Sequence, residues 1–201
     1  WVTGLVAGDK HCAWASWYKA HYKYAKRPDE GANRLSEWKA AHAALVSRRA
    51  EELRASGHEV RLEDRNKFTV EGRIVTVGGV ADIVTLRDGE VLVEDAKTGK
   101  RRDSDYWQVV MYEMLLPQAF AEYAEKPMRG AVIYGEGPAR EVSHADAKGA
   151  WPQVTSWLRL VGGDDEPSRV PSAGECRFCD VAACPERHGE ERTERRVTNE
   201  F

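Results

Sequence analysis

The chain has 201 residues, of which 42% are hydrophobic and 31% are charged. This length allows one domain with a substantial core, and the composition is that of an ordinary globular protein. The formal net charge of −3 does not indicate a nucleic-acid binder, but a local basic face would be enough for one. No apolar run approaches the ~20 residues of a membrane helix, and no signal-peptide pattern is visible. We therefore expect a cytoplasmic protein without a membrane partner.

Two helices are predicted in the first third of the chain. A segment rich in aromatic and basic residues has the spacing of a helix that ends near Pro28. A longer helical pattern runs from Arg34 to Ala55 and is stopped by Gly57, and His42 lies near its apolar stripe. The stripe recurs at intervals of three and four residues and consists of Leu35, Trp38, Ala41, Leu45 and Val46.

Short β-type runs occupy residues 58–95. The pair Asp88-Gly89 separates the last two runs and is a signal for a two-residue hairpin. These two strands are therefore expected to pair side by side. The four candidate strands are 60–65, 67–77, 80–86 and 91–95.

The second half of the chain predicts a helix, two strands and a further helix, with no repeat and no linker before Gly162. Pro117 lies within the first of these helices and predicts a kink or break there. We therefore expect one domain over residues 1–189, followed by a charged, flexible tail at 190–201. The predicted elements are a helix at 105–124, strands at 130–134 and 140–143, a helix at 145–160 and a loop at 162–171.

Acidic and basic side chains gather on the two hairpin strands. Asp95 and Lys97 are two residues apart on an extended strand, so their side chains share a face, and the hairpin brings the strand of Asp82 beside them. Carboxylate oxygens bind Mg²⁺ or Mn²⁺, the Ala96 carbonyl is placed to add a further oxygen ligand, and the Lys97 ammonium can hold a water or steady charge on a phosphate. Glu94 points to the opposite face, and a structural role is expected for it. Taken singly, a surface carboxylate and an exposed salt bridge would explain the same residues.

A glutamine and a tyrosine follow on the next helix. Gln108 and Tyr112 are four residues apart and therefore lie on one helix face. Together, Gly79-x-x-Asp82, Asp95-x-Lys97 and Gln108-x3-Tyr112 resemble the PD-(D/E)XK nuclease superfamily in its RecB-like branch. The resemblance implies an α/β, restriction-endonuclease-like fold with a mixed central sheet flanked by helices. It also implies a metal-dependent deoxyribonuclease with these catalytic residues: Asp82, Asp95, Lys97, Gln108 and Tyr112.

His42 corresponds to a histidine that several RecB-like nucleases carry on the helix before the sheet. There it is a metal ligand, which implies a site formed by His42, Asp82, Asp95 and Ala96. An imidazole among oxygen ligands favours Mn²⁺ over Mg²⁺. A core histidine without a metal is the alternative.

The four cysteines are unevenly placed, with Cys12 alone and three others in a C-x2-C-x4-C cluster. In a cytosolic chain, clustered thiols more often bind a metal or an iron–sulfur centre than form disulfides. The arrangement resembles iron–sulfur nucleases, including CRISPR-associated RecB-like exonucleases and the nuclease domain of AddB. This implies a [4Fe-4S] cluster that staples both termini into a cap. Structural Zn²⁺, held by the four cysteines or with His188 or His11 in place of Cys184, is the alternative. The implied cluster ligands are Cys12, Cys176, Cys179 and Cys184.

Basic residues next to the site predict contacts with DNA. Lys100, Arg101 and Arg102 flank Lys97, and the segment 17–27 interleaves aromatic with basic residues, as in proteins that grip single strands. Ordinary core packing of the N-terminal aromatics is the alternative.

The resemblance favours an exonuclease acting on single-stranded DNA ends, which trims spacer DNA in CRISPR adaptation beside an integrase complex. A phage recombination or degradation exonuclease of the same family is one alternative. A catalytically silent DNA-end-binding subunit with a structural cluster is the other.

Overall fold

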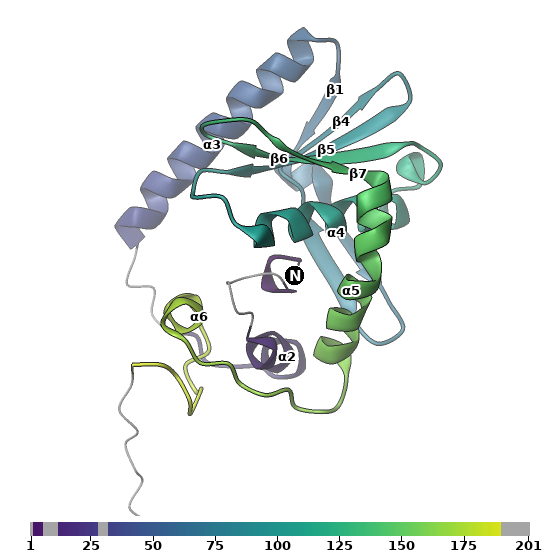
Figure 1. Ribbon diagram of the computed structural model, residues 1–201. Helices are drawn as coiled ribbons and strands as arrows, with labels where there is room; N and C mark the ends of the chain where they lie inside the picture. Colours follow the sequence, from purple (N-terminus) through teal and green to yellow (C-terminus); the bar gives the residue numbers. More distant parts are fainter. Residues whose placement is uncertain (1, 6–11, 28–31, 190–201) are drawn as a thin grey trace, which may run out of the picture.

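The computed structural model describes residues 2–5, 12–27 and 32–189. The predicted tail at 190–201, Pro28 and the alternative ligand His11 lie outside these residues. A mixed sheet forms the middle layer, with α3 on one face and α4 and α5 on the other (Figure 1). This α/β arrangement is consistent with the predicted restriction-endonuclease-like fold. No helix in the described ranges is both long and apolar enough to span a bilayer.

The main sheet has five strands in the order β1-β4-β5-β6-β7. The β5–β6 pair is parallel and the other pairs are antiparallel. Asp88 and Gly89 both have positive φ angles, 52° and 83°, which a type I′ hairpin requires, so the predicted β4–β5 hairpin is confirmed. The strands are β1 (Glu59–Leu62), β4 (Ile83–Arg87), β5 (Glu90–Lys97), β6 (Met128–Tyr134) and β7 (Arg140–Ser143).

A separate two-stranded sheet corrects the predictions for residues 60–86. Strands β2 (Lys67–Glu71) and β3 (Thr76–Val80) form an antiparallel pair, where one strand at 67–77 was predicted. A turn divides them, in which the Gly72 N–H donates to the Val75 carbonyl at 3.0 Å. The predicted strand at 80–86 is also interrupted, because Asp82 lies in the break between β3 and β4. The end of the predicted strand 60–65 is instead a 3₁₀ helix, η1 (Glu63–Asn66).

Two hydrophobic clusters fix the long helices on the sheet. Helix α3 (Ala32–Ala55) packs Leu45 and Val46 against Ile83 and Leu92 on one face. Helix α4 (Asp103–Ala119) and helix α5 (His144–Gly162) belong to the larger cluster on the other face. Because these clusters lie on opposite sides of β5, that strand is buried on both faces over most of its length. The central strand is therefore a rigid support for any side chain that projects from its end.

Two predicted helix ends are wrong. Helix α4 passes Pro117 and ends two residues later, where the Phe120 N–H donates to the Leu116 carbonyl at 2.9 Å. It is followed by a short 3₁₀ helix, η2 (Ala121–Tyr123). The N-terminal helix α2 (Ala13–His21) ends well before Pro28, because the following residues pair with the C-terminal segment through a β-bridge between Lys26 and Val181.

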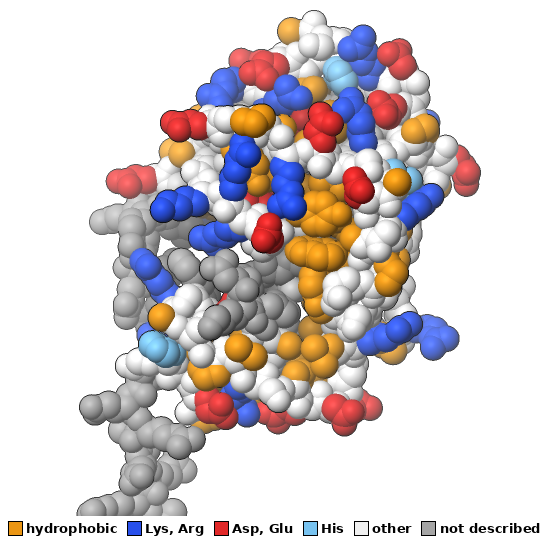
Figure 2. Space-filling view, viewed as in Figure 1, with side chains coloured by type: hydrophobic (Ala, Val, Ile, Leu, Met, Phe, Trp, Pro, Cys, Tyr) orange, Lys and Arg blue, Asp and Glu red, His pale blue; other side chains and the backbone are white. Residues whose placement is uncertain are grey.

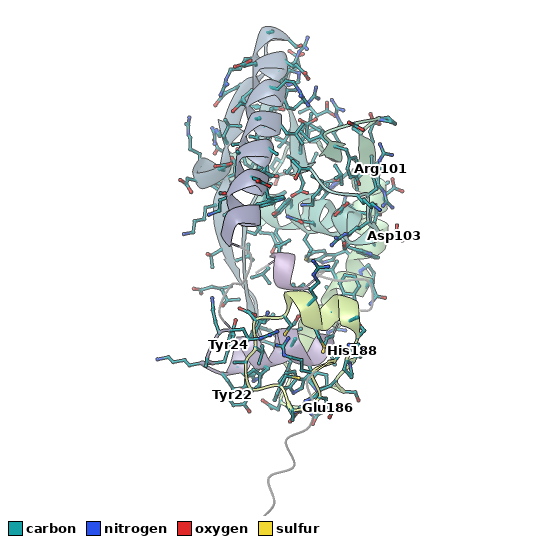
Figure 3. The ribbon with its side chains drawn as sticks, turned by 90° about the vertical axis from the view of Figure 1, so that its left-hand side faces the viewer. Tyr22, Tyr24, Arg101, Asp103, Glu186 and His188 are labelled. Atoms are coloured by element: carbon teal, nitrogen blue, oxygen red, sulfur yellow. The ribbon has the colours of Figure 1, made fainter. Side chains whose placement is uncertain are left out.

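The two ends of the described chain pack against each other. The Trp14 indole N–H donates to Glu166 at 2.7 Å, and that of Trp17 donates to the Gly163 carbonyl at 2.8 Å. Tyr22 and Tyr24 lie at the same end of the molecule as Glu186 and His188 (Figure 3). Two short helices complete the described structure: α1 (Val2–Leu5), and α6 (Ala173–Phe178) within the cysteine segment.

Candidate active site

A cavity of about 540 Å³ lies where α3, the β3–β4 break, the end of β5 and the start of α4 meet. In Figure 3, α3 is seen along its length, while Arg101 and Asp103 lie to its right and above α6. The cavity brings together acidic, basic and aromatic side chains from all four elements. Its polar and aromatic lining residues are Trp38, His42, Asp82, Asp95, Lys97, Thr98, Lys100, Arg102, Asp105, Gln108 and Tyr112.

Asp82 is held at the cavity by a neighbouring strand and by α3. Its Oδ2 accepts a hydrogen bond from the Ala96 backbone N–H at 2.7 Å and lies 3.2 Å from Nε2 of His42. The hydrogen bond to Asp82 raises the pKa of His42, and partial burial of the imidazole opposes this rise. His42 therefore lies beside the carboxylate with which it was predicted to share a metal.

A chain of contacts runs from Asp95 across the cavity floor. The Lys97 ammonium forms an ion pair with Oδ2 of Asp95 and donates to Oε1 of Gln108 at 3.0 Å. The Gln108 amide donates to the Tyr112 hydroxyl at 2.8 Å, which donates to the Val80 carbonyl at 2.7 Å. Gln108 and Tyr112 are therefore joined on one helix face, as the four-residue spacing predicts. This chain fixes the direction of the Lys97 side chain.

Asp95 is in an unfavourable place for an isolated charge. The residue is only 1% exposed, and burial raises the pKa of Asp95 to about 7. The Lys97 ammonium lowers that pKa, and the charge of Asp82 adds to the rise. A carboxylate in such a position is expected to gain from a nearby cation.

The residues present fit a hard divalent cation. Apart from its ion pair with Lys97, Oδ2 of Asp95 receives no hydrogen bond from the described residues. Two carboxylates are enough for Mg²⁺, which commonly keeps several waters and takes one or two protein carboxylates. The part of the chain that the structure describes contains no group of three or more His, Cys, Asp or Glu side chains arranged to hold a metal ion. Solvent and substrate oxygens would have to complete the coordination.

The cavity gathers all the predicted catalytic and metal-site residues. Lys100 and Arg102 also line it, whereas Arg101 lines a second cavity of about 810 Å³ together with Tyr134 and Arg140. Arg101 stacks over Tyr134, with its guanidinium carbon 4.5 Å from the ring centroid, and donates to the Pro138 carbonyl. Lys100 and Arg102 line both cavities, so the basic surface begins at the acidic site.

Glu94 has the structural role expected of it. Its carboxylate is buried on the α3 side of the sheet, where the Arg49 guanidinium donates to it at 2.8 and 2.9 Å. Adjacent acids on β5 therefore face opposite sides of the sheet.

Among the polar and aromatic residues that line the cavity, Trp38, Thr98 and Asp105 were not predicted as site residues from the sequence. Asp105 is buried and accepts from the Arg102 backbone N–H at 3.0 Å and from the Tyr134 hydroxyl at 3.3 Å. Its position in the first turn of α4 is a usable signal, because acidic residues cap helix N-termini. Trp38 was assigned to an apolar stripe, and its spacing of four residues from His42 was the available signal.

The cysteines lie in one region, but the described residues there include no group of three or more side chains arranged to hold a metal ion. Cys12, Cys179 and Cys184 pack against the cluster of Trp14, Trp17 and Val181. The His188 backbone N–H donates to Sγ of Cys176 at 3.3 Å, and Arg187 donates to the carbonyls of Cys176 and Cys179 at 2.6 and 3.0 Å. Burial raises the pKa of the Cys184 thiol.

The sequence matches the model of the PD-(D/E)XK nuclease superfamily over residues 9–185. Because the match covers most of the chain, the protein belongs to this superfamily of metal-dependent nucleases. Membership implies a phosphodiester hydrolase that acts on DNA and uses Mg²⁺ or Mn²⁺.

One solved structure similar to the chain is titled "Crystal structure of SSO0001". It shares 18% sequence identity, with 89% of this chain and 81% of that chain covered and a TM-score of 0.45. This likeness is too weak to carry the assignment, which rests on the superfamily match. The comparison with curated proteins finds no match.

Proposed function

We propose that the protein is a Mg²⁺- or Mn²⁺-dependent deoxyribonuclease, and that it acts as an exonuclease on single-stranded DNA ends. The observation that carries the proposal is the contact chain from Asp95 through Lys97 and Gln108 to Tyr112, with Asp82 and His42 in the same cavity. A silent site would need no lysine held between a buried carboxylate and a glutamine.

In this proposal Asp82, Asp95 and the Ala96 carbonyl hold the cation, with His42 as a further ligand. The bound ion would supply Lewis-acid stabilisation of the phosphate and lower the pKa of a nucleophilic water. Lys97 uses two of its three N–H donors on Asp95 and Gln108, so one donor remains for the attacking water or a phosphate oxygen. Because Tyr112 and Gln108 are themselves hydrogen-bonded, the ammonium is oriented before substrate arrives.

The proposed DNA contacts of Lys100, Arg101 and Arg102 follow the basic surface away from the acidic floor. Figure 2 shows Lys and Arg side chains interspersed with Asp and Glu around a strip of hydrophobic side chains on the face that it draws. Arg140 stacks over Tyr106 at 4.8 Å and adds a further cation to the second cavity. Cations spaced along a groove are suited to successive phosphates of one strand.

For the cysteine region we propose a [4Fe-4S] cluster held by Cys12, Cys176, Cys179 and Cys184, with structural Zn²⁺ as the alternative. The proposal is supported by the packing of three of the thiols on one aromatic cluster and by the hydrogen bond to the fourth. Iron and sulfide analysis with a visible spectrum after anaerobic purification tests it. Stoichiometric zinc in a colourless protein would contradict the cluster.

The biological setting proposed is spacer trimming in CRISPR adaptation beside an integrase complex. It rests on the resemblance of the cysteine pattern, and a phage recombination or degradation exonuclease uses the same chemistry. Neighbouring genes would distinguish the two.

The test of the proposed activity is digestion of end-labelled single-stranded DNA with Mn²⁺, using protein purified anaerobically. Wild type, Asp95→Ala and the surface control Asp165→Asn are compared, since Asp165 is exposed and outside the cavity. Cleavage by wild type and the control but not by Asp95→Ala is expected. A folded wild type that binds DNA and never cuts it would favour the silent DNA-end-binding subunit.

A further inference from the structure

Trp38 is an exposed tryptophan in the wall of the acidic cavity. The side chain is 51% exposed, whereas Trp14 and Trp17 are buried. Their indole N–H groups donate to protein acceptors, and no hydrogen bond from the Trp38 indole is found among the described residues. Packing in the hydrophobic core therefore does not account for the position of this ring, which lies in the wall of the cavity.

The apolar stripe of α3 explains how the ring comes to be there. Leu45 and Val46 from this stripe are buried against the sheet, but Ala41 and Trp38 lie beyond the covered part of the helix. Trp38 precedes His42 by one turn, and the two rings are 5.3 Å apart between centroids with a 31° tilt. Since His42 contacts Asp82, one imidazole separates the indole from the acidic floor.

The cavity therefore offers different chemistry on different walls. Carboxylates of Asp82 and Asp95 form the floor, Lys100 and Arg102 supply positive charge, and Trp38 supplies a flat apolar face. A nucleotide combines the complementary parts, because its phosphate needs cations and its base needs a stacking surface.

We propose that Trp38 stacks on an unpaired nucleobase whose neighbouring phosphate lies against Lys100 and Arg102, and so makes the site selective for single-stranded or frayed DNA. The inference rests on the proposed nuclease function and names the residue that selects its single-stranded substrate. Inside a duplex each base is paired and stacked on both sides, so a base can reach the indole only after leaving the helix, at a cost in unstacking energy. Stacking is tolerant of sequence, because every base has a π face.

The test combines Trp38→Ala with the removal of single bases from the substrate. Short labelled oligodeoxythymidylates are prepared, each with one abasic tetrahydrofuran residue at a different distance from the mapped cleavage position. With the intact strand we expect Trp38→Ala to lower kcat/KM by roughly tenfold to a hundredfold. With the strand that lacks the stacked base, the kcat/KM of wild type should fall by a similar factor. The kcat/KM of Trp38→Ala should hardly fall further on this strand.

Two control variants are measured on the same strands. Trp38→Phe keeps an aromatic face and should retain most of the activity. Ile74→Ala removes an equally exposed apolar side chain at the β2–β3 turn, outside the cavity, and should behave like wild type on every strand. An equal loss for Trp38→Ala on intact and all abasic strands would overturn the proposal, because it would mean that the ring acts through His42 rather than through a base.

A binding measurement tests the stacking inference independently of the nuclease proposal. Fluorescence anisotropy with the same strands in the presence of a chelator measures stacking without cleavage. If wild type never cuts but Trp38→Ala and base removal show the same coupled loss of affinity, the stacking inference stands and the nuclease proposal fails. If wild type cuts, but base removal weakens wild type and Trp38→Ala by the same factor in both kcat/KM and affinity, the nuclease proposal stands and the stacking inference fails.

Discussion

Lys97 on β5 and Gln108 on α4 are joined by a 3.0 Å hydrogen bond across the cavity. Neither element could hold the lysine in this position alone, since Gln108 is in turn bonded to Tyr112, and Tyr112 to the backbone of β3. The ammonium is therefore positioned by three separate segments of the chain.

The first prediction follows from this contact. Gln108→Ala should lower kcat by about tenfold to a hundredfold with a smaller change in KM, because small misplacements of a catalytic group are costly. Gln118→Ala is the matched control, since Gln118 is exposed on the same helix and its side-chain amide donates to the Met114 carbonyl, away from the cavity. Steady-state kinetics with saturating Mn²⁺ would check both. A change confined to KM would show that Gln108 contacts substrate rather than positioning Lys97.

The basic residues beside the cavity lead to a prediction about the salt dependence of DNA binding. Arg101→Ala with Arg102→Ala should weaken binding of single-stranded DNA and reduce the slope of log K against log salt concentration by up to about 1.4, since each lost phosphate contact removes ~0.7. Arg73→Ala with Arg159→Ala removes two exposed arginines outside both cavities and should leave the slope unchanged. An unchanged slope in the first double variant would rule out phosphate contacts by this pair.

His42 makes a prediction about metal preference. His42→Ala should lower activity with Mn²⁺ more than with Mg²⁺, because an imidazole ligand suits Mn²⁺ better. The quantity to measure is the ratio of kcat/KM in the two metals, and His58→Ala, at a histidine outside the cavity, should keep the wild-type ratio. Equal losses with both metals would indicate that His42 only supports Asp82, with which it is in contact.

The site could be anticipated from the sequence mainly because one local signal determined a tertiary contact. The Asp88-Gly89 turn pairs β4 with β5 in a register that opposes Ile83 to Glu94, and this brings Asp82 next to the strand of Asp95. The breaks around Gly72 and Asp82 were missed, because continuous β-type residues run through both. The exposure of Trp38 could not be predicted from the hydrophobic periodicity either. The periodicity places Trp38 on the same helix face as Leu45, but it does not tell where the sheet beneath that face ends.

A glycine on β6 makes a prediction about stability. A Cβ atom at Gly130 would lie 2.2 Å from Cγ1 of Val109 and 2.8 Å from Oε1 of Glu113, both on α4. Gly130→Ala should therefore lower the free energy of unfolding by about 1–3 kcal/mol, the usual cost of overpacking. Gly135→Ala is the control, since its added Cβ would meet nothing within 4 Å. Urea unfolding of both variants would measure the difference, and equal stabilities would mean that α4 can shift away from the sheet.

Glu113 makes a prediction about pH. This side chain is fully buried on α4, and burial raises the pKa of Glu113 to about 8, with a contribution from Asp146. The His144 imidazole contacts it, with 3.5 Å between Nδ1 and Oε2, and burial lowers the pKa of that imidazole. Burial thus disfavours the charged form of both groups, so this contact joins a neutral acid and a neutral imidazole rather than an ion pair.

Between the ordinary glutamate pKa of 4.5 and about 8, the folded protein keeps a proton on Glu113 that the unfolded chain has lost. Stability should therefore fall as pH rises through this window, by at most about 1.4 kcal/mol per pH unit from this one group. Glu113→Gln removes the dependence, so its advantage over wild type should grow from pH 5 to about pH 8 and then level off. The raised pKa of Asp95 adds a fall of the same sign to both proteins and cancels in their difference. Urea unfolding in a metal-free buffer series measures that difference, and a constant value across the window would show that Glu113 is ionised in the folded state.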